Sequence, residues 1–100
     1  MSNNIIWLAI LRGAIEKSID KLLSDEVLSS SRKLFENMKP TIKNSDDAIL
    51  GYVFGHVSGF MDMTFSNLNR QPTDEDINEI ANAITGRMEE IKSRIYETKT

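Results

Sequence analysis

Apolar residues along most of this chain recur every three or four positions, which is the period of a helix with one buried face. Turn signals interrupt the pattern near Ser24, at Pro40 and over residues 69–72. Consecutive helices joined by short turns usually run antiparallel. The pattern therefore predicts an all-α protein, a small antiparallel bundle in a single domain over residues 1–100, with four helices near residues 3–23, 24–38, 45–69 and 73–95.

The boundary between the first two helices rests on a local signal. Ser24 followed by Asp25 and Glu26 is typical of a helix start, because a hydroxyl caps free amides and acids suit the positive end. No Gly or Pro occurs in residues 14–39, so one long helix over residues 4–38 is the alternative. Such a helix is well above the usual length, and we favour the break at Ser24.

The segment over residues 45–69 is predicted to be the central helix. Gly51, Gly55 and Gly59 recur every four residues, which places them above one another on one helix face. The opposite side carries bulky apolar residues: Leu50, Val53, Phe54, Val57, Met61, Phe65 and Leu68. The expected element is a helix with a groove of small residues on one side and a bulky stripe on the other.

Three glycines inside one helix are costly, since each destabilises it by about 0.8–1 kcal/mol relative to alanine. Close approach of a second backbone along the groove would offset that cost through dispersion contacts. The neighbour is either another helix of the same chain or a second copy, and a ligand against bare backbone is a third alternative. Because three short amphipathic helices cover only part of an apolar central helix, we expect a homodimer.

Further interface residues follow from the same pattern. The first helix has a small patch at positions four apart, and Trp7 nearby is expected to cover a core edge or an interface. Asp62 falls in line with the glycines, so it either faces solvent or pairs with Arg12 or Arg87. The expected interface comprises Ala9, Gly13, Gly51, Gly55, Gly59 and Asp62.

The last helix is expected to begin at Thr73, whose hydroxyl precedes three acidic residues. Its inner face should be an apolar stripe at helical spacing: Ile77, Ile80, Ile84, Met88, Ile91 and Ile95.

Composition narrows the class of protein. The chain has 40% apolar and 27% charged residues, as in globular proteins, and no cysteine, which excludes disulfides and thiolate metal sites. A net charge of −3 counts against general nucleic-acid binding. The apolar run over residues 5–11 lacks the basic flank and cleavage site of a signal peptide. Residues 48–68 could span a bilayer by length, but Asp62 and other polar residues interrupt them, so we expect no membrane span.

No catalytic or cofactor motif occurs in the sequence. His56 is the single histidine, and helical geometry gives it no partner ligand, so no metal or cofactor is expected. The predicted function is a non-catalytic, cytoplasmic helical protein that acts through protein–protein association, by self-association or with another protein. One alternative is a module that binds a small apolar ligand beside Tyr52, His56, Phe60 and Met63. A DNA-linked regulator is the other, and it would need a basic surface made by Arg32, Lys33, Lys39 and Lys43.

Overall fold

The computed structural model describes residues 2–97, with side chains from Asn4 onward, and all regular structure in that range is helical. The expected all-α class is therefore confirmed. Five α-helices are followed by a short π-helix, labelled η1: α1 (Ser2–Leu22), α2 (Asp25–Glu36), α3 (Ser45–Asn67), α4 (Asp74–Thr85), α5 (Met88–Lys92) and η1 (Ser93–Glu97).

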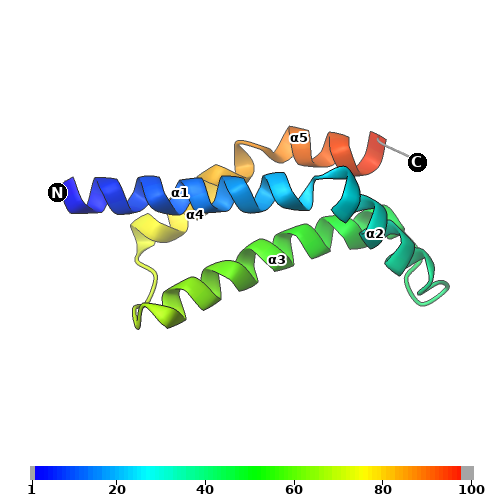
Figure 1. Ribbon diagram of the computed structural model, residues 1–100, viewed down its shortest axis with the longest axis horizontal. Helices are drawn as coiled ribbons and strands as arrows, with labels where there is room; N and C mark the ends of the chain where they lie inside the picture. Colours follow the sequence, from blue (N-terminus) through cyan, green and yellow to red (C-terminus); the bar gives the residue numbers. More distant parts are fainter. Residues whose placement is uncertain (1, 98–100) are drawn as a thin grey trace.

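The helices form an elongated molecule with extents of 49 × 24 × 20 Å. α1 and α3 run in opposite directions, and α4 and α5 return in the direction of α1 (Figure 1). α2 does not fold back along α1; it continues past the end of α1 and packs against the first half of α3. In this fold α1 and the α4–α5 segment run parallel to each other, α3 runs antiparallel to both, and α2 lies across one end. This arrangement differs from the predicted antiparallel bundle of four helices.

The core lies between these helices. α1 and α3 contribute most of its side chains, and α2, α4, α5 and η1 add the remainder. Its fully or nearly fully buried apolar residues are Leu11, Ile15, Ile19, Leu22, Leu23, Leu28, Ile49, Val53, Val57, Met61, Phe65, Ala83, Ile91 and Ile95.

Side chains cap the starts of three helices. The Ser24 hydroxyl accepts a hydrogen bond from the Val27 amide (3.3 Å), which confirms the expected break between α1 and α2. The predicted segment begins at Ser45, but the side chain that caps α3 is Asn44, one residue earlier. Ser45 is buried and donates instead to the Glu36 carboxylate of α2.

The end of α3 determines how the chain enters α4. Asn69 has a positive φ of 53°, a conformation that asparagine tolerates better than most residues. The Asn69 amide donates to the Ser66 carbonyl and the Arg70 amide to the Phe65 carbonyl, which is the Schellman arrangement. That turn places the Arg70 guanidinium 5.8 Å from the Phe65 ring centroid.

The last predicted helix is interrupted. Arg87 has φ −113° and ψ 10°, which separates α4 from α5, and η1 then widens the final turn. Ile91 and Ile95 are fully buried as expected, but Ile77 is 51% exposed and the adjacent Asp76 is buried in its place. The prediction for Ile77 was wrong because hydrogen bonds from Trp7 and Arg70 hold the Asp76 face of α4 inward.

The two ends of this isoleucine series provide a matched test. Ile91→Ala should destabilise the protein by about 2–5 kcal/mol, since it removes a fully buried side chain. Ile77→Ala, the same change at an exposed position, should cost much less. Urea unfolding followed by the fluorescence of Trp7 measures both, and equal costs would contradict this assignment of the core.

Candidate functional site

The small-residue side of α3 is open. Gly51, Gly55 and Gly59 are exposed, and a Cβ atom built on any of them meets nothing within 4 Å. The alternative in which another helix of the same chain packs into this groove is therefore excluded for the part of the chain that the structure describes. We call these glycines together with Asp62 the glycine face.

The glycine face lies opposite the core along the whole helix, for a geometric reason. The buried residues of α3 recur every four positions, and each glycine comes two positions after one of them. Two positions correspond to a rotation of about 200° around a helix. Both series drift around α3 together, so they stay on opposite sides: Ile49, Val53 and Val57 inside, Gly51, Gly55 and Gly59 outside.

Of the two alternatives for Asp62, the structure shows exposure to solvent and not a pair with Arg12 or Arg87. Its side chain is exposed at the end of the glycine face, where it lines a polar hollow beside Arg70 and Gln71. The two arginines considered as its partners are engaged elsewhere. Arg12 pairs with Glu79 at 2.5 Å, and Arg87 pairs with acids of α1 and α5.

The outer side of α1 is a second exposed face. Ala9 and Gly13 lie on it, as expected, but sequence reasoning missed their neighbours as interface residues. Ile5, Ile6 and Ile10 are 70%, 57% and 59% exposed. The sequence does contain a signal for these exposed isoleucines. Residues 5–11 include no polar residue, so a helix over that run must expose apolar side chains.

A hollow between α1 and α4 adjoins this outer side, and most of its lining is apolar. We call it the α1–α4 hollow; it is lined by Ile5, Leu8, Ala9, Arg12, Gly13, Glu16 and Glu79.

The protomer has more surface than its size predicts. Its accessible surface is 6655 Å², whereas a compact monomer of 11.3 kDa exposes about 5,700 Å². Its radius of gyration is 15.2 Å, against about 13 Å for a compact domain of 100 residues. The excess of about 900 Å² is close to the ~800 Å² that each partner buries in a protein interface of standard size.

A buried carboxylate joins α1 to the start of α4. Asp76 accepts hydrogen bonds from the Trp7 Nε1 at 2.8 Å, the Thr73 amide at 2.9 Å and the Arg70 guanidinium at 3.0 Å. Arg70 also covers the Trp7 ring, 4.6 Å from its centroid. Burial alone would raise the pKa of Asp76, but these donors outweigh it and hold the pKa below its usual range.

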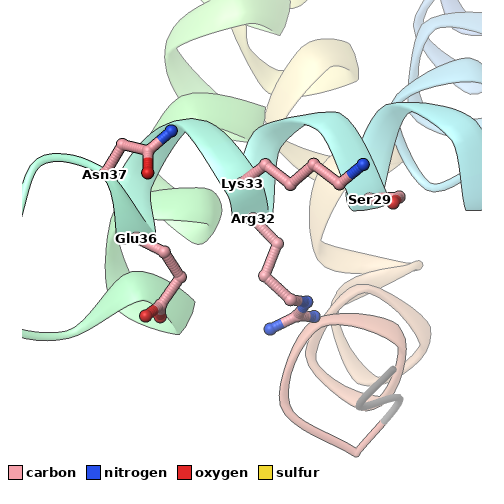
Figure 2. Close-up of a pocket in the computed structure, with 5 residues that line it drawn as sticks. All are labelled: Ser29, Arg32, Lys33, Glu36 and Asn37. Carbon is pink, nitrogen blue, oxygen red and sulfur yellow. The ribbon is translucent and has the colours of Figure 1, made fainter.

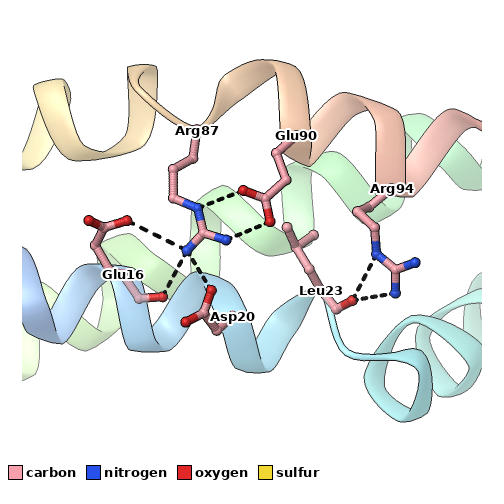
Figure 3. A network of polar contacts seen from close by, with 6 residues as sticks. All are labelled: Glu16, Asp20, Leu23, Arg87, Glu90 and Arg94. Carbon is pink, nitrogen blue, oxygen red and sulfur yellow. Dashed lines mark hydrogen bonds and ion pairs between the residues drawn. The ribbon is translucent and has the colours of Figure 1, made fainter.

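A second polar network joins the middle of α1 to α5 (Figure 3). The Arg87 guanidinium binds both carboxylate oxygens of Glu90 at 2.9 and 2.6 Å, Asp20 at 2.6 Å and the Glu16 carbonyl at 3.1 Å. The hydrogen bonds that Arg87 donates to Glu90 raise the pKa of Arg87 despite its partial burial, and they lower the pKa of Glu90. The single guanidinium therefore links carboxylates on two helices and holds α1 against α5.

Arg94 performs a similar role one heptad later. Its guanidinium donates to the Leu23 carbonyl at 2.7 Å and to Asp25 at 2.8 Å (Figure 3 shows the Leu23 contact). A cation at the carboxyl end of α1 also complements the negative end of the helix dipole.

The basic residues around α2 do not make a continuous basic surface. Figure 2 shows Arg32 and Glu36 on the same side of α2, around a hollow at the surface. Arg32 binds Asp46 at 2.6 Å and the Ile95 carbonyl at 3.0 Å, and Lys39 pairs with Glu36 at 3.1 Å. The residues required by the DNA-binding alternative, Arg32, Lys33, Lys39 and Lys43, are thus interleaved with acids, which disfavours contact with phosphates.

The ligand-binding alternative would need an enclosed apolar cavity beside Tyr52, His56, Phe60 and Met63, but most of these residues are exposed. His56 is exposed and its ring lies 5.8 Å from that of Tyr52, and Met63 is exposed as well. A hollow near Tyr52 opens toward α2 rather than toward His56. Among residues 2–97, no group of three His, Cys, Asp or Glu side chains is arranged to hold a metal ion.

Comparisons with protein-family models, with curated proteins and with solved structures found no match to this chain. Of the helices described above, none combines the length and apolar character needed to cross a bilayer.

The Asp76 cluster gives a prediction with a defined sign. Asp76→Asn should cost about 2–4 kcal/mol at pH 7, because the carboxylate's buried donors lose a charged acceptor. A folded pKa below the unfolded value of about 3.9 means that this contribution is present above pH 4 and is lost as the pH falls further. The difference in urea midpoint between wild type and variant should therefore shrink from pH 7 to pH 3. A difference that does not change with pH would contradict this role.

Proposed function

We propose that this protein is non-catalytic and acts by self-association, with the glycine face of α3 as the contact between copies. The observation that supports the proposal is the open groove at Gly51, Gly55 and Gly59, where the chain supplies no neighbour within 4 Å. Three glycines in the middle of a helix cost about 3 kcal/mol. Nothing inside the protomer offsets this cost, and a second helix in the groove would.

The available surface agrees with such a contact. The excess of about 900 Å² over a compact monomer matches one side of a standard interface. Two helices that cross at Gly55 would bring their backbones closest there, since no side chain separates them. The opposing surface on the second copy is either its own α3 or its patch at Ala9 and Gly13.

The compartment is part of the same proposal. We assign the protein to the cytoplasm, because a chain without cysteine makes no use of an oxidising environment.

Substitutions at Gly55 test the proposed contact. Gly55→Ala restores helix propensity but adds a methyl group where backbones meet, and Gly55→Leu adds more bulk at the same point. At a contact between copies, Gly55→Leu should lower the average mass in solution and the melting temperature. Both losses should become smaller as protein concentration rises. Light scattering and thermal unfolding measure them.

Asn78→Leu is the matched control, because it adds leucine at an exposed position of α4. It should leave the mass unchanged. If both Gly55 variants are more stable than wild type and equal to it in mass, the glycine face is not a contact.

A further inference from the structure

The amino-terminal half of α1 exposes an apolar surface that the core does not use. Ile5, Ile6 and Ile10 are all more than half exposed. The first charged residue of the chain is Arg12, and it is bound to Glu79 of α4. Several exposed apolar side chains gathered on one helix face are typical of a protein contact.

The same surface offers both projections and recesses. Ala9 and Gly13 lie between Ile5 on one side and Ile6 and Ile10 on the other, as the 100° rotation per residue requires. The α1–α4 hollow deepens the recess beside the small residues. A partner that fits must therefore place β-branched side chains against Ala9 and Gly13. It must place small side chains against the isoleucines of this helix.

We infer that the occupant is α1 of a second copy, packed antiparallel about a two-fold axis between Ala9 and Ile10. In a two-fold contact, if residue i meets residue j then residue j meets residue i. With the axis at this point, Ile6 meets Gly13 of the second copy and Ile10 meets its Ala9. Each pair combines one large and one small side chain, so the helices approach closely without overlap. No other antiparallel two-fold registration of α1 gives two such pairs from Ile6, Ala9, Ile10 and Gly13.

The area required is present. Two α1 helices in contact over about three turns bury less than a standard interface, and the hollow walls with Leu8 and the Arg12 stem add to it. The excess surface of the chain, about 900 Å², is larger than one side of such a small contact, so part of it remains for the glycine face.

This contact uses a different side of the molecule from the glycine face, and it rests on the proposed function only in that both require self-association. In the α1 contact, Ala9 and Gly13 meet α1 of the second copy. The glycine face of α3 then meets α3 of another copy. A chain with both contacts assembles beyond a dimer, and a chain with the α1 contact alone stops at a dimer.

The absence of cysteine from the chain allows a direct test by disulfide trapping. Ala9→Cys places the two thiols one position apart along the helix axis, which suits the Cα separation of about 4.4–6.8 Å that a disulfide needs. Lys17→Cys is the matched control, exposed on the same side of α1. Its two copies would be separated by fifteen positions, or about 22 Å along the helix axis. Under mild oxidation, Ala9→Cys should form a covalent dimer and Lys17→Cys should not.

A second pair of variants measures the energy of the contact. Ile10→Glu brings two carboxylates together at the axis and should raise the dissociation constant by about tenfold or more. Lys17→Glu should have a much smaller effect. Circular dichroism verifies that both variants remain helical, as expected for exposed positions.

The outcomes separate this inference from the proposed function. Trapping at Ala9 supports the α1 contact whether or not Gly55→Cys also forms dimers. Trapping at Gly55 alone, or equal trapping at Ala9 and Lys17, overturns it and leaves the α3 contact standing. A monomeric wild type overturns both. A monomer that binds phosphatidylglycerol vesicles, and loses that binding in Ile10→Glu, assigns the face to a membrane surface and also overturns it.

Discussion

The structure depends on one constraint, the four-residue spacing shared by the buried side chains and the glycines of α3. A spacing of four residues rotates by about 40° more than one whole turn, so each series winds slowly around the helix. Because the two series have the same spacing, they wind together and remain on opposite sides. One series faces the other helices and comprises Ile49, Val53 and Val57. The other series faces away from them and comprises Gly51, Gly55 and Gly59. The packing of the protomer and the open groove are consequences of the same pattern.

The charged residues of this protein mainly connect helices. Asp76 joins α1 to the loop before α4, Arg87 joins α1 to α5, and Arg94 holds the end of α1. Each is satisfied by partners within the chain, and the shifted pKa values of Asp76 and Arg87 follow from those partners. Perturbed ionisable groups often mark catalytic sites. Here they lie between helices rather than in a shared cleft, and their shifts follow from holding those helices together.

The sequence predicted the parts of the fold that local chemistry determines. Ser24, Pro40 and Thr73 act through their own backbone geometry or their near neighbours, and the helix boundaries they imply agree with the structure to within a few residues. The same holds for the burial of Val53, Val57, Met61 and Phe65.

Other features depend on contacts distant in sequence and could not be predicted in this way. Asp76 is buried because Trp7, 69 positions away, donates to it, and this contact turns Ile77 outward. The break at Arg87 likewise depends on partners in α1. The sequence identified the small residues of the candidate site. Only the structure shows that none of the described helices covers them. It also shows that Ile6 and Ile10 are exposed beside Ala9.

The central claim is that these open faces bring copies of the chain together. Sedimentation equilibrium of the wild-type protein over a wide range of concentrations tests it most directly. The account predicts an average mass that rises from 11.3 kDa toward at least twice that value as concentration increases. A mass that remains at 11.3 kDa up to the highest workable concentration would contradict it.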